Sequence, residues 1–135
     1  MNPTMSPIDW AKRPFQKYAD FGGRAPRAEY WWFVLFVFIG EIIAMLLDSI
    51  VGTGGIVGNY GIFVLLFVLA VIIPHIAVGI RRLHDTDHSG WWLLIAFIPL
   101  VGAIVLLVFF VTSGDSGDNR FGPNPYSADV GEVFA

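Results

Sequence analysis

A short polar stretch between two apolar runs holds much of the ionisable chemistry of this chain: "RRLHDTDHSGWW", residues 81–92. Its candidate functional side chains belong to two arginines, two histidines and two aspartates: Arg81, Arg82, His84, Asp85, Asp87 and His88. Side chains of these types bind metal ions or phosphate groups and act as acids and bases in catalysis. A cytoplasmic turn between two membrane helices is the alternative that needs no ligand.

His84 and His88 are the candidate metal ligands, because residues four apart share one face of a helix. The zinc motif with that spacing also places a glutamate between the histidines, and it is missing here. A phosphohydrolase centre built on His84 and Asp85 would need further His and Asp ligands that the chain lacks. Ser89 and Gly90 are typical of the cap and first turn of a following helix. The pattern therefore favours a turn, and we predict no metal, no cofactor and no catalytic residue.

The turn interpretation accounts for most of this stretch. Arg81 and Arg82 would end a helix, where positive charge suits both the helix C-terminus and the cytoplasmic face of a membrane. Asp85 lies four residues after Arg81, which is a pairing distance on a helix. Thr86, Asp87 or Ser89 would cap the next helix. The two histidines remain unexplained by this interpretation.

A second segment, "FGGRAPRAEYWW", adds Arg24 and Arg27 at the start of the first apolar run. If both segments lie on one side of a membrane, Arg24, Arg27, Arg81 and Arg82 share one headgroup level. Guanidinium groups bind phosphate through two parallel hydrogen bonds, so this rim is a candidate site for anionic lipid headgroups. The alternative is that the four arginines only fix the orientation of the chain.

The composition predicts a membrane protein. Of the 135 residues, 56% are hydrophobic and only 14% are charged, against about 25% charged in soluble domains. A soluble fold of this size could not cover its surface with so little charge. The chain has no cysteine, which excludes disulfides and thiolate metal sites. The net charge of −3 gives no indication of nucleic-acid binding.

Three runs reach the length of about 20 apolar residues that a bilayer span needs: residues 30–50, 61–80 and 91–112. Lipid offers no hydrogen bonds to the backbone, so each run should be helical. We predict an all-α integral membrane protein with three transmembrane helices in a domain over residues 30–112. Residues 1–29 form a basic and aromatic N-terminal segment, and residues 113–135 form a flexible polar tail.

Lys and Arg residues predict the orientation. Seven lie before the first run or in the 81–90 bridge, and one, Arg120, lies in the tail. The positive-inside rule then places the N-terminus and the bridge in the cytoplasm, and the 51–60 loop and the tail outside. The alternative is that Pro99 and Gly102 bend the third run into a re-entrant hairpin, which would return the tail to the cytoplasm.

The segment before the first run should begin with a helix. Ser6 is a candidate N-cap, followed by Pro7 at the first helical position, and Pro14 should break or kink the helix. Aromatic residues beside Lys12, Arg13 and Lys17 indicate a segment that lies on the membrane surface. A loosely ordered basic leader is the alternative. In the tail, "DSGDN" fails the spacing of an EF-hand calcium loop.

Glu41 is the ionisable residue placed deepest in the first run, eleven residues from Tyr30 and roughly 16 Å along the helix. A carboxyl group near the membrane midplane is costly and usually faces protein or water. Pro74 leaves the carbonyl of Ala70 without its helical partner, and a neutral Glu41 at similar depth is predicted to donate to it. A packing hydrogen bond is the favoured interpretation. A proton or ion pathway is the alternative.

Several motifs give the chain a family resemblance: "F-x-G-R-x-x-R-x-E-Y-W" over residues 21–31, "RRLHD" over 81–85, "SGWW" over 89–92, "IPLVG" over 98–102 and "NRFGPNP" over 119–125. They closely resemble a bacterial inner-membrane family catalogued as domain of unknown function 805. The resemblance covers most of the chain. It implies a small multi-pass protein of the bacterial inner membrane, and it implies no activity, substrate or catalytic residue.

We therefore predict a non-enzymatic, membrane-embedded interaction or accessory module that binds anionic lipid headgroups through the arginine rim. Its expected partners are membrane lipids and a second membrane protein or further copies of the chain, with no nucleic acid. The alternative is a subunit of an oligomeric transporter or channel that uses Glu41. An enzyme acting on a lipid headgroup is a third hypothesis.

Overall fold

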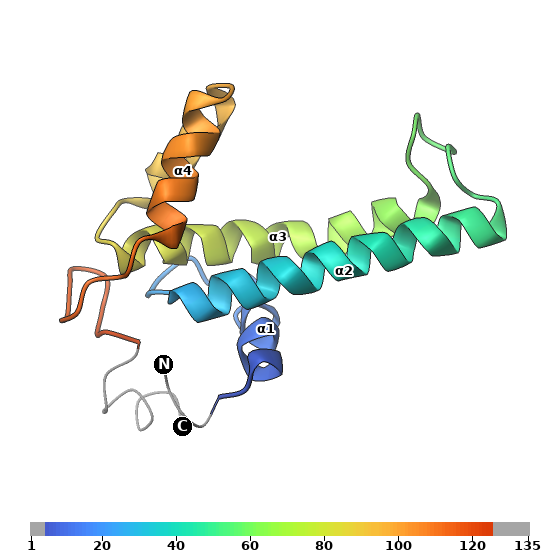
Figure 1. The fold of residues 1–135 in the computed structure, drawn as a ribbon. Helices are drawn as coiled ribbons and strands as arrows, with labels where there is room; N and C mark the ends of the chain where they lie inside the picture. The colour runs from blue at the N-terminus through green and yellow to red at the C-terminus, as the bar shows by residue number, and fades with distance from the viewer. Residues whose placement is uncertain (1–4, 126–135) are drawn as a thin grey trace.

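The structure is a computed structural model that describes residues 5–125, and these residues are helical with irregular connections (Figure 1). The prediction of an all-α fold is therefore confirmed for this part of the chain. Five helices follow one another along the chain: α1 (Pro7–Gln16), α2 (Arg27–Val51), α3 (Ile62–Asp85), the 3₁₀ helix η1 (Gly90–Phe97) and α4 (Val101–Val111).

Helices α2 and α3 form a long antiparallel pair that extends beyond the rest of the molecule (Figure 1). Both are long and apolar enough to cross a membrane, with mean hydropathies of 2.4 and 2.8 over their most apolar stretches. They match the first two predicted runs. Helix α2 begins after Pro26 at its N-cap and ends at Val51, where Gly52 is the C-cap with a φ of 83° that favours glycine.

Small residues let α2 and α3 approach closely. A Cβ atom on Gly40 would overlap the ring of Phe67, and Ala44 one turn later is buried. Small residues separated by four positions allow two membrane helices to pack backbone to backbone. This small-residue pair is therefore used inside the molecule, in the contact between α2 and α3.

Asp48 closes the outer end of the pair, where residues 52–61 connect α2 to α3. Its carboxylate accepts hydrogen bonds from the backbone N–H groups of Phe63 and Val64, at 2.9 and 3.1 Å, and from the hydroxyl of Thr53 at 2.6 Å. Asp48 thus caps the first turn of α3 from another helix and places negative charge at its positive end. Only glycine fits at position 61, because a Cβ there would overlap this carboxylate.

The third apolar run differs from the prediction of a single helix over residues 91–112. It folds into a hairpin of η1 and α4, which have 8 and 11 residues. Each of these two helices is about 16 Å long, too short to cross a hydrocarbon core of about 30 Å. The chain reverses around Pro99 and Leu100, and Leu100 has a φ of 64°. Gly102 permits the reversal, because a Cβ there would overlap the carbonyl of Ile95. The expectation of three spanning helices is therefore not supported, and the hairpin alternative describes this run.

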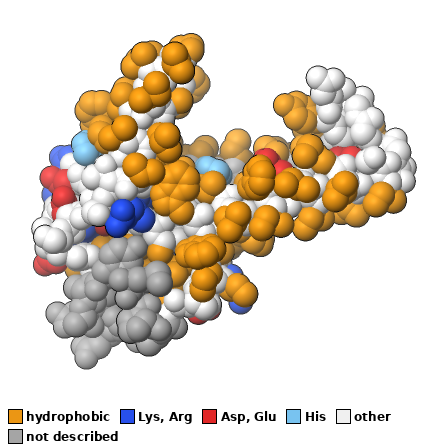
Figure 2. All heavy atoms as spheres, viewed as in Figure 1, with side chains coloured by type: hydrophobic (Ala, Val, Ile, Leu, Met, Phe, Trp, Pro, Cys, Tyr) orange, Lys and Arg blue, Asp and Glu red, His pale blue; other side chains and the backbone are white. Residues whose placement is uncertain are grey.

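The hairpin stands away from the α2–α3 pair and is hydrophobic over its visible surface (Figures 1 and 2). Trp91, Phe97 and Leu100 are among its most exposed side chains, each more than 70% accessible. Residues Gly102, Leu106 and Phe110 of α4 are buried, and the exposed apolar side chains of the hairpin are typical of a surface that faces lipid.

Helix α1 packs across α2 on the side opposite to α4 (Figure 1). It begins as predicted, with Ser6 as N-cap and Pro7 in the first turn, and Asp9 completes a capping box. Pro14 lies in its last turn, and the helix ends two residues later. The ring of Phe15 contacts that of Phe33 edge to face, with centroids 5.3 Å apart. The segment is therefore a packed helix and not a loosely ordered leader.

Candidate functional site

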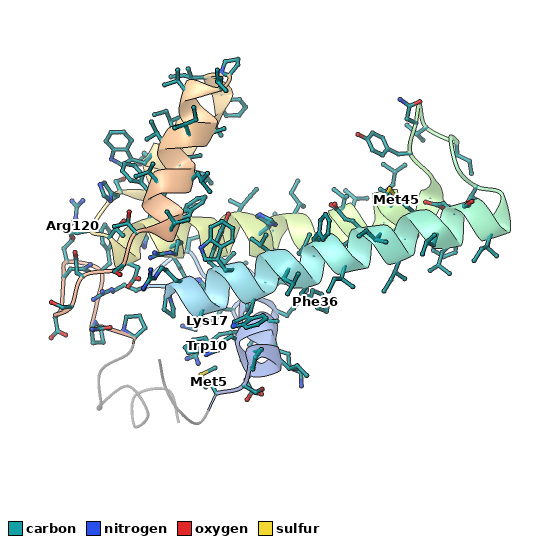
Figure 3. All side chains as sticks on the ribbon, in the orientation of Figure 1. Met5, Trp10, Lys17, Phe36, Met45 and Arg120 are labelled. Carbon is teal, nitrogen blue, oxygen red and sulfur yellow. The ribbon has the colours of Figure 1, made fainter. Side chains whose placement is uncertain are left out.

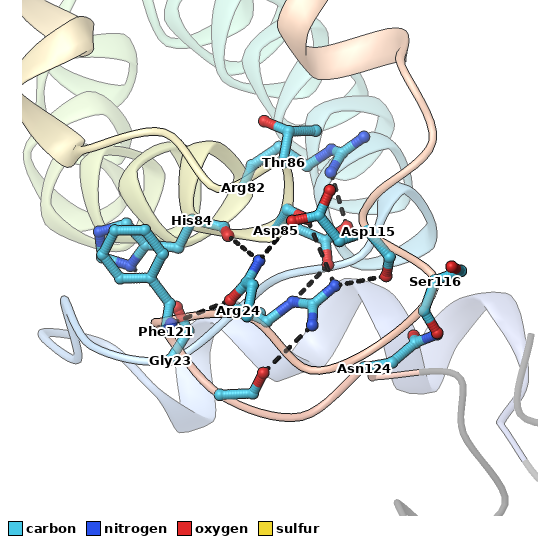
Figure 4. Close-up of polar contacts among 12 residues, drawn as sticks. Gly23, Arg24, Arg82, His84, Asp85, Thr86, Asp115, Ser116, Phe121 and Asn124 are labelled. Atoms are coloured by element: carbon cyan, nitrogen blue, oxygen red, sulfur yellow. Dashed lines mark hydrogen bonds and ion pairs between the residues drawn. The ribbon is translucent and has the colours of Figure 1, made fainter.

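The arginine-rich end of the molecule brings together four parts of the chain that are distant in sequence. The loop before α2, the end of α3, the end of α4 and the segment 113–125 meet there (Figure 4). Five charged side chains are almost completely buried in this cluster, which we call the arginine network: Arg24, Glu29, Arg81, Arg82 and Asp85.

Asp85 lies at the centre of the arginine network. One carboxylate oxygen accepts from Nε of Arg24 at 2.9 Å, and the other accepts from Nη1 of Arg82 at 2.8 Å. The sequence prediction that Asp85 pairs with Arg81 is wrong. Helical spacing allows a partner at either three or four residues, and the fold brings Arg82 and Arg24 to this carboxylate instead.

The two guanidinium groups use their remaining N–H groups on backbone carbonyls. Arg24 donates to the carbonyls of Asp115 at 2.7 Å and Gly117 at 2.8 Å. Arg82 donates to the carbonyl of Phe110 at 3.1 Å and also to that of Thr112. A buried guanidinium is stable only when its charge and its donors both find partners. These bonds therefore hold the end of α4 and the tail against α3.

Arg81 forms a second ion pair with Glu29 of α2, and its Nε donates to the carbonyl of Asp20 at 3.0 Å. Arg13 of α1 lies 3.9 Å from the same carboxylate. Burial lowers the pKa of nearby Lys17, and the charge of Glu29 opposes that shift. Glu29 thus gathers cationic side chains from α1 and α3 around the start of α2.

The tail packs against this end, so the prediction of a flexible solvated segment does not hold for residues 113–125. The N–H of Asp115 donates to the carbonyl of Asp85 at 2.8 Å, and Nδ2 of Asn119 donates to the carbonyl of His84 at 2.9 Å. Arg120 pairs with Asp87 at the surface, at 3.2 Å. The rest of the predicted tail lies outside the described residues.

The two histidines of the bridge are packing residues in different contacts. His84 stacks on Phe121 of the tail with ring centroids 3.9 Å apart, and its Nδ1 lies 2.9 Å from the carbonyl of Gly23. His88 stacks on Phe109 of α4 at 4.2 Å. The imidazoles thus fix the tail and the hairpin on either side of the bridge. Ser89 caps η1, as the turn interpretation predicts.

Arg27 differs from the other three arginines of the predicted lipid-binding rim. Its side chain is exposed, with one guanidinium nitrogen 3.2 Å from the carbonyl of Val111. Arg24, Arg81 and Arg82 are instead buried among protein partners. The structure thus separates one accessible arginine from three structural ones, and lipid binding by the rim stays a prediction.

Glu41 lies on the outer part of the α2–α3 pair and lines a groove beside Met45 and Tyr60. The carbonyl of Ala70 has a different donor from the one predicted, because the hydroxyl of Tyr18 donates to it at 2.5 Å. The sequence prediction is right that this carbonyl needs a partner outside its helix, and wrong in naming Glu41.

His75 is an intramembrane ionisable residue that the sequence analysis missed. It packs edge to face against the rings of Tyr30 and Phe33, and its charged form would be attracted to Glu41. The signal was present in the sequence, since a histidine inside an apolar run next to Pro74 is as unusual as a carboxyl group.

Two long apolar helices and a hydrophobic hairpin are features of a multi-pass membrane protein, and the relatives that this chain resembles are named inner membrane proteins. The chain belongs to the family described as Protein of unknown function (DUF805), whose model matches residues 18–123. It is 42% identical to inner membrane protein YhaH and 43% identical to inner membrane protein YhaI, both of Escherichia coli K12. Each comparison covers 87% of this chain and at least 96% of the relative. No solved structure matches.

Proposed function

We propose that the protein is a non-enzymatic, membrane-embedded interaction module, in which the arginine network builds a rigid cap on a two-helix membrane anchor. The observation that carries the proposal is the position of Asp85 between Arg24 and Arg82. These charges are satisfied by protein groups and buried from solvent, which suits a structural role. Acid–base catalysis would require such groups to reach a substrate.

The cap also supports a topology with both flanking segments in the cytoplasm. The segment 113–125 is bonded to the same end as Arg24 and Asp85, so it lies on the side of the N-terminal segment. All eight Lys and Arg residues then fall on that side, a stronger asymmetry than the seven-to-one division of a three-span topology. The positive-inside rule supports a cytoplasmic location for this end.

Single cysteines test this topology in a chain that has none of its own. We expect Thr53→Cys, in the outer connection, to react with an impermeant thiol reagent on spheroplasts, where the outer membrane does not obstruct the reagent. Ser116→Cys, in the tail, should react only after the inner membrane is permeabilised. Labelling of position 116 in sealed spheroplasts would contradict the cytoplasmic tail.

Within this proposal, Arg27 is the arginine that contacts anionic lipid headgroups, because its side chain is exposed and bonded only to the carbonyl of Val111 among the described residues, while the other three are buried. It lies at the start of α2, at the headgroup level, where basic side chains are attracted to anionic lipids. Arg24, Arg81 and Arg82 contribute by holding the cap in place.

Retention of anionic lipid, measured by native mass spectrometry after mild extraction, tests this assignment. Arg27→Gln should reduce retained phosphatidylglycerol severalfold. Arg120→Gln is the matched control, because it removes another exposed positive charge, which lies in the tail and pairs with Asp87 of the bridge. Equal lipid retention by the two variants would show that Arg27 has no specific part in lipid binding.

A second candidate function is that of a subunit in an oligomeric transporter or channel. It is favoured by the presence of two ionisable residues, Glu41 and His75, within the apolar helices α2 and α3. Proton or cation flux in liposomes tests it. Flux that is present in the wild type and lost in a stable Glu41→Gln variant would support the transporter, and no flux in either would refute it.

A further inference from the structure

A groove of about 350 Å³ lies on the outer part of the α2–α3 pair, toward the connection between the two helices. We call this part of the pair the outer arm. Its lining comes from α2, α3 and their connection: Glu41, Met45, Tyr60, Val64, Leu65 and Val68. Met45 points to the same side as the raised connection (Figure 3). Figure 2 shows acidic side chains among hydrophobic ones on this part of the arm, and the sequence has only Glu41 and Asp48 as acids there.

The carboxyl group of Glu41 has far fewer partners than its neighbour on the same helix. Asp48 accepts three hydrogen bonds from Thr53, Phe63 and Val64. Among the described residues, Glu41 makes no hydrogen bond and no ion pair, and its side chain is partly accessible from the groove. A carboxyl group at this depth in a bilayer is expensive unless a polar or charged partner reaches it.

The lining of the groove selects the chemistry of that partner. Glu41 contributes the only ionisable carboxyl group of the lining, Tyr60 adds a phenol, and the other four side chains are apolar. A lipid acyl chain would fill the space and leave the carboxyl group unpaired. A small inorganic cation would need several oxygen ligands, which two side chains do not supply. A positive charge that carries its own apolar surface matches both features of the groove.

We propose that this groove binds a lipophilic organic monocation, whose charge pairs with the carboxylate of Glu41 while its apolar substituents contact Met45, Leu65 and Val68. Its volume lies at the lower end of the range for small-molecule sites, about 300–1,000 Å³. The site is independent of the headgroup contact at Arg27, which lies at the other end of α2.

Two probe ions of the same shape and opposite charge test the proposal. Full-length protein in nanodiscs of neutral lipid is equilibrated with tetraphenylphosphonium or tetraphenylborate, and saturable binding is measured against empty nanodiscs. We expect the wild type to bind the cation saturably and to bind the anion no more than empty nanodiscs do. Failure of the cation to bind above that background would overturn the proposal.

Variants then locate the site. Glu41→Gln keeps the side-chain shape and should weaken cation binding at least tenfold. Leu65→Trp keeps the carboxylate, fills the groove and should also weaken binding. Asp118→Asn is the matched control, because it changes an exposed acid in the tail to its amide outside the groove. Cation binding that is unchanged in Glu41→Gln or in Leu65→Trp, with the variant shown to be folded by thermal unfolding, would refute this site.

Discussion

The arginine network lies at one end of the α2–α3 pair, and the groove at Glu41 lies on the outer part of the same pair. The two regions differ in how their charged side chains are partnered. At the arginine end, Asp85 is 1% accessible and is held by two guanidinium groups. On the outer arm, Glu41 lies in an apolar groove without a hydrogen bond from the described residues. Both carboxylate oxygens of Asp85 are bonded to guanidinium groups of the chain, whereas we propose that the carboxyl group of Glu41 pairs with a ligand from outside. A charged side chain whose partners come from the chain itself therefore indicates a structural role. A carboxyl group without such a partner indicates a binding site.

The two ends of the helix pair also differ in how they stabilise a buried aspartate. Asp48 uses the backbone N–H groups of a helix start, which its own connection brings within reach. Asp85 uses guanidinium groups, and one of them, that of Arg24, comes from a segment far away in sequence. A local turn can be fixed by a cap, whereas a long-range junction requires long side chains with several donors.

The sharpest test of this contrast is Asp85→Asn. It leaves Arg24 and Arg82 buried without a carboxylate, and breaking such a buried pair costs about 3–5 kcal/mol. We expect a large loss in the thermal stability of the protein in detergent, together with release of the segment 113–125 to proteolysis.

Asp87→Asn is its control, because the pair between Asp87 and Arg120 is about half exposed. Exposed pairs contribute about 0–1 kcal/mol, so this variant should resemble the wild type. If Asp85→Asn were as stable as Asp87→Asn, the arginine network would not hold the cap together.

The hairpin offers a test at a different point of the same end. In Gly102→Ala, the added methyl group must displace the backbone at Ile95, so η1 and α4 cannot keep their contact. Overpacking of this kind costs about 1–3 kcal/mol. Gly54→Ala adds the same methyl group where no atom lies within 4 Å, and it should be nearly neutral. A Gly102→Ala variant with wild-type stability would show that the third run does not fold back on itself.

At the outer end, Asp48→Asn should have a smaller effect than Asp85→Asn. The amide keeps one acceptor oxygen, so one of the three donors from Thr53, Phe63 and Val64 loses its partner. An unsatisfied buried donor costs about 1–3 kcal/mol. Hydrogen exchange at the first turn of α3 would locate the loss, and unchanged protection at Phe63 and Val64 would show that this carboxylate is not the cap.

Sequence reasoning recovered helices α1, α2 and α3 but not the long-range contacts between them. The length and apolar composition of the runs located α2 and α3, and cap residues located the start of α1, because these features depend on neighbours in sequence. The bridge was predicted as a turn, yet its histidines stayed unexplained because their partners, Phe109 and Phe121, lie in later segments.

The third run shows a different limit. Its length and hydropathy satisfy the requirement for a span, and only Pro99 and Gly102 indicate a reversal. Both residues also occur in continuous membrane helices. Whether the run forms a spanning helix or a hairpin depends on the contacts available to the returning chain. Arg82 provides such a contact, because it donates to the carbonyls at the end of α4. That contact joins residues about thirty positions apart, beyond the reach of local rules.

The smallest predicted effect concerns the one hydrogen bond whose acceptor was predicted correctly and whose donor was not. Tyr18→Phe removes the hydroxyl that donates to the carbonyl of Ala70, and such bonds contribute on average about 0.6 kcal/mol in membranes. Glu41→Gln should leave stability unchanged, because Glu41 has no hydrogen bond to lose among the described residues. Thermal unfolding of both variants in one detergent decides between the donors. A loss in Glu41→Gln with none in Tyr18→Phe would restore Glu41 as a packing residue and remove the unpaired carboxyl group that distinguishes the arm from the arginine network.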